Sequence, residues 1–364
     1  MYSNLFSPFK IRNKILKNRI FVAAMATQYA DKYGFVSDAM VDYYVHMSLT
    51  GVAAIFVEAA VVSSEGRGWS RQLSATSKEA LPGLSRIAEA ISERGPIPFL
   101  QLHHAGRQAL PTGNSPVVAP SGIPCPVLNR KVRVLSPKEI GNMVEKFTFS
   151  ASLAQEAGFA GIELHGAHGY LLHQFVSPLT NKRDDEYGLQ NSEPFKFPLA
   201  VVRSIKINFP KMLLIYRISA RDYLPKGLTL DKSLPLVKRL LENGVDVISV
   251  SGGMYQSLHG PDSILGPATD QGFFRQDAKA IKLGTNAPTG VTGKIQYPSL
   301  AEEILKNAEA DLIGLGRPIL RDPNWLWKTL EKEKGIIREC LLCERCNYHR
   351  KGCPDDAEAP IWTK

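Results

Sequence analysis

The feature that most constrains the fold of this chain is a series of eight short apolar runs, each followed by a helical pattern. The runs cover residues 19–25, 53–59, 97–102, 161–165, 213–219, 245–251, 289–293 and 311–316. Amphipathic stretches between them include residues 137–157, 230–243 and 299–308. Strands that are apolar throughout are typical of parallel sheets covered by helices. Eight strand–helix units favour a closed barrel, so the sequence predicts an α/β fold, a (β/α)8 TIM barrel.

The length and composition agree with one barrel domain. The chain has 364 residues, of which 44% are hydrophobic and 22% are charged, as in ordinary soluble proteins. α/β barrels commonly use such a length as a single domain. We expect the barrel over residues 1–335 and a short Cys-rich segment, residues 336–364, packed on or near it. No GxGxxG motif follows the first strand, which argues against a Rossmann sheet.

The net charge of +9 permits an anionic partner, but its distribution does not favour nucleic acid. Basic residues are scattered and do not alternate with aromatic residues as in a nucleic-acid platform. No run approaches the about 20 apolar residues of a membrane span, and the N-terminus has no signal-like pattern. We therefore expect a cytoplasmic protein with no membrane or nucleic-acid partner, and we also expect a homo-oligomer.

Polar residues gather where the predicted strands end, which is where barrel enzymes carry their chemistry. They are Gln101, His103, His165, His168, Arg217, Ser249, Ser251 and Arg317. Two connections on this side are long, residues 103–136 and 252–272, and both are rich in Gly and Pro. Long loops over an active face are typical of lids.

The segment after the fourth predicted strand carries the most specific pattern. His165 and His168 are three residues apart at the strand end, and Tyr170 follows. Imidazole N–H groups can hold a substrate carbonyl oxygen, and a phenol can donate a proton. Metal binding is the alternative interpretation, although no third ligand is evident in this segment.

Four of the five cysteines crowd the C-terminus. Cys340, Cys343, Cys346 and Cys353 have the spacing Cys-x2-Cys-x2-Cys-x6-Cys, whereas Cys125 stands alone. In a cytosolic chain such spacing favours a metal over disulfides. Four thiolates suit a [4Fe–4S] cluster or zinc, and a segment without metal stays open as a third possibility.

These patterns together resemble the Old Yellow Enzyme family of FMN-dependent ene-reductases. The flavin-binding half of the 2,4-dienoyl-CoA reductases and trimethylamine dehydrogenase belongs to the same superfamily. The strongest likeness is IELHGAHGYLLHQFVSPLTNKRDDEYG at 162–188. Similar stretches are NRIFVAAM at 18–25, FVEAAVVSSEGRG at 56–68, QLHHAGRQ at 101–108, YRISA at 216–220, VSGG at 250–253 and GLGRPILRDPNW at 314–325.

The resemblance implies FMN as cofactor, NAD(P)H as reductant, and hydride transfer through flavin N5 to an activated C=C bond. It implies that His165 and His168 polarise the substrate carbonyl and that Tyr170 donates the proton. The cofactor-binding residues that it implies are Ala24, Met25, Ala26, Ala59, Gln101, Arg217, Ser251, Gly293, Gly316 and Arg317. Among these, Gln101 would bond the pyrimidine edge of the flavin, Arg217 would lie near N1 and O2, and the last three would hold the phosphate.

Two departures from the family pattern bear on the flavin. Ala24 stands where the family often has Pro, and Ala26 stands where many members have a Thr or Cys that tunes the flavin potential. Thr27 is adjacent to that position. The redox potential implied by the resemblance is therefore open.

Two other functions compete with the ene-reductase. One is an amine or dienoyl-CoA oxidoreductase subunit that uses a [4Fe–4S] cluster. Since the chain ends at Lys364, we expect the FAD/NAD domain of the larger relatives to be absent, so this subunit would need a separate electron-transfer protein. The other is a non-redox barrel such as an aldolase, which would require a catalytic Lys or a metal in the mouth.

Overall fold

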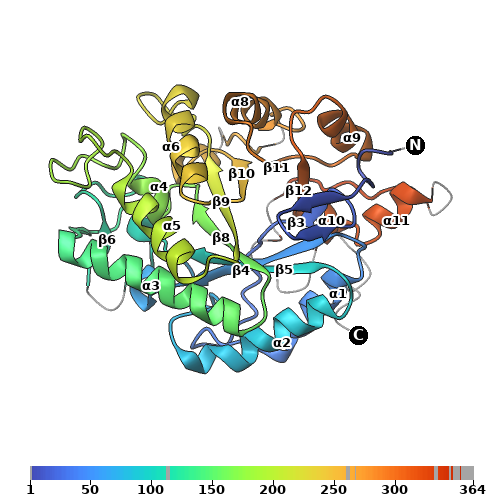
Figure 1. The fold of residues 1–364 in the computed structure, drawn as a ribbon, viewed down its shortest axis with the longest axis horizontal. Coiled ribbons are helices and arrows are strands. Elements are labelled where there is room, and N and C mark those ends of the chain that lie inside the picture. The colour runs from blue at the N-terminus through green and yellow to red at the C-terminus, as the bar shows by residue number, and fades with distance from the viewer. Residues whose placement is uncertain are drawn as a thin grey trace.

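The predicted eight-stranded barrel is confirmed. The computed structural model describes residues 2–111, 115–259, 263–266, 268–331, 335–343, 346 and 353. Its parallel strands close in the order β3, β4, β5, β8, β9, β10, β11 and β12, and β12 pairs with β3 (Figure 1). Their bounds are Ile20–Val22, Ala54–Val61, Ile97–His103, Gly161–Gly166, Leu213–Ser219, Val247–Ser251, Thr289–Thr292 and Leu312–Leu315. The first strand ends at Val22, three residues before its predicted end, so Met25 lies in the loop beyond it.

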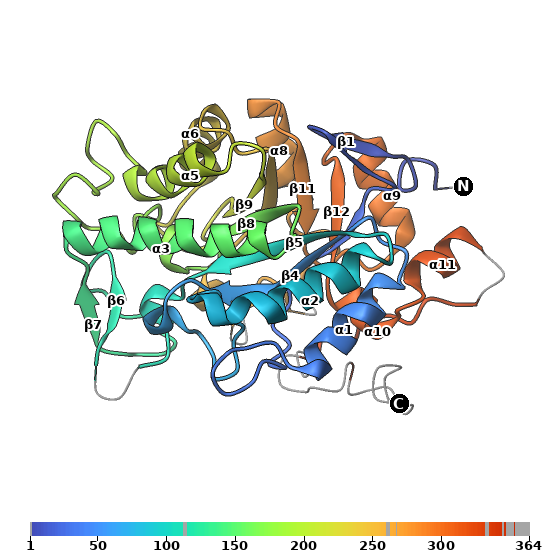
Figure 2. The same ribbon diagram turned by 60° about the horizontal axis from the view of Figure 1, so that its bottom comes forward.

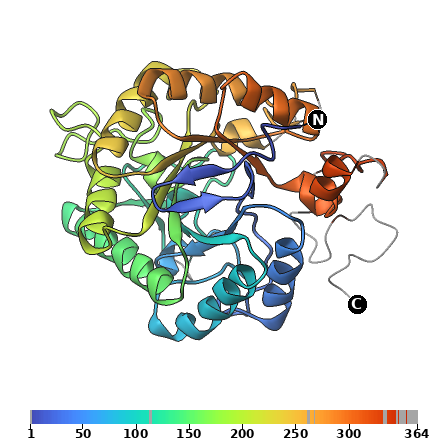
Figure 3. The same ribbon diagram turned by 45° about the vertical axis from the view of Figure 1, so that its right-hand side comes forward.

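Helices surround the barrel, as Figure 3 shows in a view along it. The longer ones are α1 (Asp38–Ser48), α2 (Leu81–Ser92), α3 (Pro137–Glu156), α5 (Lys196–Asn208), α6 (Leu230–Glu242), α8 (Arg275–Thr285) and α9 (Pro298–Lys306). Shorter ones are α4 (Leu171–Gln174), α7 (Tyr255–Leu258), α10 (Arg317–Arg321) and α11 (Trp325–Leu330). The start of α3 is fixed by a capping box between Ser136 and Glu139 and by Pro137 at its first position. No helix among the described residues is long and apolar enough to span a membrane.

A hairpin that the sequence does not predict closes the N-terminal end of the barrel. It consists of β1 (Phe9–Ile11) and β2 (Lys14–Leu16), and it crosses the barrel end in Figure 3. Inside this end, Phe56 stacks on Phe99 at 4.8 Å between ring centroids, and buried Ile11 and Leu16 belong to the same apolar cluster. The hairpin and these rings thus fill the N-terminal end of the barrel with apolar side chains.

The two long connections contain structure of their own. Residues 103–136 include a 3-10 turn, η3 (Gly106–Gln108), and a strand pair, β6 (Val117–Ala119) with β7 (Val132–Val134). The connection after β10 contains α7. Figure 2 shows the β6–β7 pair and the β1–β2 hairpin at opposite ends of the molecule. The long connections therefore lie with the C-terminal mouth of the barrel.

Candidate active site

A buried carboxylate and guanidinium form the floor of the mouth. Glu163 on β8 is 0% exposed, and Arg217 on the neighbouring strand β9 has its Nη1 4.0 Å from Glu163 Oε2. Gln101 on β5 donates from Nε2 to the same carboxylate. Burial raises the pKa of Glu163, and Arg217 counteracts part of that shift. The three side chains come together because β5, β8 and β9 are adjacent in the barrel.

Arg217 has donor capacity left over. Its Nε and Nη1 are buried and have no hydrogen-bond partner within the part of the chain that the structure describes. A buried guanidinium normally uses its donors, because an unpaired buried donor costs about 1–3 kcal/mol. These groups therefore fit a ligand that presents an oxygen or nitrogen acceptor deep in the mouth.

His165, His168 and Tyr170 form one aromatic group above this floor. The ring of His165 lies 5.0 Å from that of His168 and 4.8 Å from that of Tyr170, centroid to centroid, with edge-to-face geometry. Burial, and then neighbouring His168, His103 and Arg217, lower the pKa of His165 well below its usual value. Burial and Arg217 do the same for the pKa of His168. Both rings are therefore neutral at pH 7 and act as hydrogen-bond donors without charge.

Tyr170 keeps its proton over the ordinary pH range. Burial, followed by interaction with Tyr255, raises the pKa of the Tyr170 phenol well above its usual value. Its ring also meets His103 at 4.3 Å between centroids. A protonated phenol next to two neutral imidazoles suits proton donation to a bound substrate.

The backbone that carries these groups has an uncommon conformation. His168 has φ +60° and Gly169 has φ +76°, both in the left-handed region that residues with side chains seldom adopt. The Ser219 hydroxyl accepts from His168 N at 2.9 Å, and Gln108 Nε2 donates to His168 O at 3.2 Å. A Cβ at Gly169 would lie 2.6 Å from Gln108 Oε1, so at this φ a side chain would strain the turn and displace Gln108.

A buried pair behind this turn was not predicted from the sequence. His173 Nδ1 accepts from Gly169 N at 2.8 Å, so the His173 proton is on Nε2, which lies 2.9 Å from Asp222 Oδ1. That N–H is not well aligned on the oxygen, and both side chains are at most 1% exposed. The signal was present: His173 closes the HGYLLH motif, and Asp222 follows β9 by three residues.

The predicted phosphate residues line a cavity together with residues of the mouth. The cavity has a volume of about 130 Å³, and the predicted residues that line it are His168, Arg217, Ser251, Gly293, Gly316 and Arg317. At Gly293 φ is +147°, and a Cβ would lie 2.5 Å from the Phe274 ring, so only glycine fits. Lys294 also lines the cavity. One cavity thus joins the strand-seven and strand-eight glycines to Arg217.

The predicted ring-lining alanines are less closely gathered. Met25 and Ala26 line a second, smaller cavity with Thr27 and Tyr29. Ala24 instead packs on the apolar cluster inside the barrel, and Ala59 is buried in β4, where its carbonyl accepts from Gln72. No described cavity brings Ala24 or Ala59 together with Arg217.

Thr27 does not take over the role that Ala26 lacks. Its hydroxyl and its backbone N–H both donate to Oε2 of buried Glu58. Burial raises the pKa of Glu58 to about 7, although the hydrogen bonds from Thr27 lower it. Because residue 26 is Ala and the Thr27 hydroxyl is bonded to this carboxyl group, neither position offers a hydroxyl or thiol to a bound ring.

The four C-terminal cysteines lie in the same region but do not form a metal site. Cys340 lines the 130 Å³ cavity, Cys346 lines the smaller one beside Met25, and Arg321 Nη1 is 3.6 Å from Cys353 Sγ. Cys340 N donates to Gln296 Oε1, which ties the segment to the loop after β11. Among the described residues, which include all four cysteines, no group of three or more His, Cys, Asp or Glu side chains could hold a metal ion. The predicted metal site is therefore not observed, and the rest of the segment 336–364 lies largely outside the described residues.

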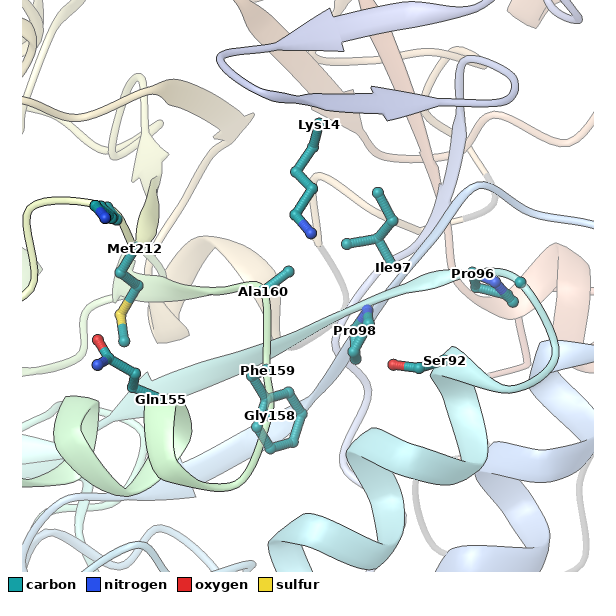
Figure 4. Close-up of a pocket in the computed structure, with 12 residues that line it drawn as sticks. Lys14, Ser92, Pro96, Ile97, Pro98, Gln155, Gly158, Phe159, Ala160 and Met212 are labelled. Atoms are coloured by element: carbon teal, nitrogen blue, oxygen red, sulfur yellow. The ribbon is translucent and has the colours of Figure 1, made fainter.

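A larger cavity than the one in the mouth lies elsewhere. It has a volume of about 500 Å³ and lies at the N-terminal end of the barrel, where Figure 4 shows Lys14 of the hairpin above Ile97, Ala160 and Met212. Its walls are mostly loop residues and apolar side chains. Size alone does not identify an active site, because the open donors and the shifted histidines lie at the other end.

Comparison with known proteins identifies the family to which this geometry belongs. The family model described as "NADH:flavin oxidoreductase / NADH oxidase family" matches residues 4–334. The chain belongs to this family. The match, together with relatives at 37–38% identity, confirms the family that the sequence resembles. Membership also confirms the predicted enzyme class, an FMN-dependent oxidoreductase of NAD(P)H.

The similar proteins fall into two lengths. An NADH oxidase of Thermoanaerobacter brockii is 38% identical over 94% of this chain, but the match covers only 53% of that protein. An NADPH dehydrogenase of Geobacillus is 37% identical, with 95% of this chain and 99% of that protein covered. This chain thus spans about half of the first relative and nearly all of the second.

Solved structures agree on the fold. A 2-naphthoyl-CoA reductase in complex with 2-naphthoyl-CoA superimposes with a TM-score of 0.88 at 24% identity, covering 94% of this chain and 54% of that one. The Old Yellow Enzyme homologue of Zymomonas mobilis has a TM-score of 0.79 at 24% identity, with 96% and 97% covered. At these identities the likeness shows the barrel alone.

Proposed function

We propose that this chain is an NAD(P)H-dependent, FMN-containing reductase of activated alkenes such as enones, enoates or dienoyl compounds. The observation that carries the proposal is the single cavity that joins His168, Arg217 and the phosphate glycines. His165 and Tyr170 adjoin His168 on the same side of the barrel. A redox cofactor and a carbonyl-bearing substrate can thus meet in one mouth.

The residues present fit FMN. Arg217 offers unpaired donors where an acceptor edge of a ring can lie, and Gln101 retains its carbonyl oxygen as an acceptor because Nε2 is bonded to Glu163. Gly293, Gly316 and Arg317 supply close backbone approach and a positive charge for one phosphate. When bound, FMN supplies the hydride carrier between NAD(P)H and the alkene.

The side chains of the chain would do the remaining chemistry. Two neutral imidazole donors, His165 and His168, would hold the substrate carbonyl oxygen and stabilise the negative charge that grows on it. Tyr170 would donate the proton to the α-carbon, since its phenol is protonated at neutral pH. Arg217 would add a fixed, buried positive charge beside the bound cofactor.

The test of the proton donor is Tyr170→Phe, which keeps the ring and removes the proton. Stopped-flow measurement should show alkene reduction slowed by about 10²–10⁴ and flavin reduction by NAD(P)H nearly unchanged. The control is Tyr33→Phe, since Tyr33 is 63% exposed, and it should alter neither half-reaction. Equal slowing of both half-reactions by Tyr170→Phe would instead assign Tyr170 a role in positioning.

The cofactor is tested separately. Heat-released cofactor should be FMN by chromatography, because the site offers one phosphate position. FAD, or no flavin in protein made with ample riboflavin, would refute the assignment.

A second candidate is an oxidoreductase subunit that works with a separate electron-transfer protein, and it would need a [4Fe–4S] cluster on Cys340, Cys343, Cys346 and Cys353. It is favoured by the position of Cys340 and Cys346 in the walls of the two mouth cavities. The cysteines are not arranged as a metal site, so no step of the reaction is assigned to a cluster. Iron and zinc analysis of anaerobically purified protein decides: about four iron atoms per chain support it, and an iron-free, active enzyme excludes it.

Four expectations from the sequence remain predictions. They are a separate electron-transfer protein, a homo-oligomeric assembly, a cytoplasmic location and a boundary between the barrel and the Cys-rich segment at residues 335/336.

A further inference from the structure

The hydrogen bonds around the two catalytic histidines decide which ring nitrogen of each can serve a substrate. A neutral imidazole carries one proton, and the nitrogen with that proton is the only donor. For His165, Ala167 N donates to Nδ1 at 3.4 Å, so the proton is on Nε2. His165 can therefore offer Nε2–H to a carbonyl oxygen.

In His165 the nitrogen bonded within the protein is Nδ1, whereas in His168 it is Nε2. His168 Nε2 lies 2.8 Å from the hydroxyl oxygen of Ser251, at the end of β10. Nδ1 is then the nitrogen left for a substrate. If the proton were on Nε2, Nδ1 would present a lone pair and repel a carbonyl oxygen; if Ser251 donates, Nδ1 carries the proton and attracts it.

The surroundings of Ser251 favour Ser251 as the donor. Its side chain is 3% exposed, and among the described residues the only hydrogen-bond partner of its hydroxyl is His168. A buried hydroxyl whose proton points at no acceptor is costly, and Nε2 without its proton is the acceptor available. Ser219, by contrast, donates its hydroxyl proton to Gly253 O and accepts from His168 N, so its role is fixed on both sides.

The His168 ring cannot easily turn to exchange its nitrogens. The backbone is held at φ +60° by Ser219 and Gln108, and the next N–H is held by His173. The ring lies edge-to-face against His165 at 5.0 Å between centroids. Since the packing on His165 and the contact with Ser251 keep Nε2 at the serine, the direction of the Ser251–Nε2 hydrogen bond determines the tautomer.

We propose that Ser251 is a positioning residue that donates to His168 Nε2 and so keeps the His168 proton on Nδ1, facing the substrate. The proposal rests on the function proposed above for His168. It assigns Ser251, which was predicted to bind the cofactor, to the histidine instead. The site then presents two donors of different kinds, Nε2–H of His165 and Nδ1–H of His168, to one oxygen.

The test compares Ser251→Thr with Ser251→Val in the FMN-loaded enzyme. Thr and Val have nearly the same shape, and Val carries a methyl group where Thr carries its hydroxyl. p-Hydroxybenzaldehyde serves as the probe, because its phenol oxygen mimics the substrate carbonyl. We expect Ser251→Thr to retain binding and Ser251→Val to bind the probe about tenfold more weakly, with similar FMN retention in both.

A second measurement reads the tautomer itself. In protein labelled with ¹⁵N-histidine, long-range ¹H–¹⁵N correlation should show His168 protonated on Nδ1 in the wild type, with His168→Ala used to assign the signal. In Ser251→Val the Nε2–H form should become populated. A wild-type signal from Nε2–H overturns the proposal. Equal probe binding by the Thr and Val variants also overturns it. If both variants in addition lose FMN to the same extent, Ser251 is a cofactor-binding residue instead.

The two levels of inference fail differently. If His168→Ala binds the probe and reduces alkenes like the wild type, the proposed role of His168 at the carbonyl is wrong. The tautomer measurement on the wild type would still stand as a result about Ser251.

Discussion

The substitution Asp222→Asn tests whether the buried pair behind the catalytic turn holds that turn in place. Asp222 is 0% exposed, and each of its oxygens faces at least one buried donor. Oδ2 accepts from Ser177 Oγ at 2.6 Å and from Leu228 N at 2.7 Å, while Oδ1 faces His173 Nε2 at 2.9 Å. Asn has the same shape but replaces one of these oxygens by an NH2 group.

Neither orientation of the Asn amide satisfies the site. With the NH2 towards Leu228, two donors meet, and a backbone N–H cannot reverse its direction. With the NH2 towards His173, two donors meet again unless His173 changes tautomer, and that change would give up the bond from Gly169 N to Nδ1. The variant therefore leaves at least one buried donor unpaired and removes the charge from the remaining bonds.

The structure sets the size of the effect. An unpaired buried donor costs about 1–3 kcal/mol, and a hydrogen bond to a charged group contributes about 1.5–3 kcal/mol. Since the His173 contact is poorly aligned, we expect a loss of about 3 kcal/mol. For 364 residues, an unfolding entropy of about 2.1 cal/mol/K per residue turns this into a melting temperature about 4 °C lower.

The assay pairs thermal unfolding of the FMN-loaded enzyme with stopped-flow kinetics. Because Gly169 lies between His168 and Tyr170, Asp222→Asn should slow alkene reduction more than flavin reduction. Asp38→Asn is the matched control, since the Asp38 side chain is 88% exposed and should change stability by less than about 0.5 kcal/mol. A melting temperature within about 1 °C of the wild type, with both half-reactions intact, would refute the reasoning.

Three further predictions follow from the same structure. Gly314→Ala would place a Cβ 2.1 Å from Thr292 Oγ1 and 2.6 Å from the Phe21 ring, and it should destabilise the barrel by about 1–3 kcal/mol in denaturant melts. Arg217→Met removes the partner of buried Glu163 and should cost about 3–5 kcal/mol at pH 7, and melts at lower pH should show a smaller loss because a protonated Glu163 needs no partner. Burial raises the pKa of Asp222, but His173 and the hydrogen bonds outweigh burial, so the pKa is lowered overall. The wild type should therefore be more stable than Asp222→Asn above about pH 4. Melts should show this difference disappear as the pH falls through the folded-state pKa of Asp222.

The sequence predicts the barrel well because its signal is local. A buried parallel strand must be apolar over its whole length, so each run is visible without knowledge of its neighbours. The β1–β2 hairpin gives no such signal. Its two strands have three residues each and include exposed Lys10, Lys14 and Ile15, and only Ile11 and Leu16 are buried in the core. Its role depends on the barrel end that it covers.

The candidate site is predictable in its residue types but not in its pairings. His165, Arg217 and Ser251 can be predicted from the sequence, because they are polar residues at or near the ends of the apolar strands β8, β9 and β10. The partners of these residues are distant in sequence: Ser251 is 83 residues from His168. A pattern along the chain cannot show such a contact. The resemblance to a family therefore assigned Ser251 to the cofactor and not to His168.

The same reasoning applies to Thr27. Its position next to Ala26 suggested a substitute for the missing hydroxyl or thiol, but the buried carboxyl group of Glu58 claims its side chain. A buried carboxyl group without hydrogen-bond donors costs free energy in the folded state. The Thr27 hydroxyl therefore serves Glu58 and is not left for a ligand in the mouth. The reactivity of the mouth is therefore set by which donors the buried acceptors leave free. Arg217 keeps free donors because Glu163 is served partly by Gln101, and His168 keeps Nδ1 because Ser251 takes Nε2.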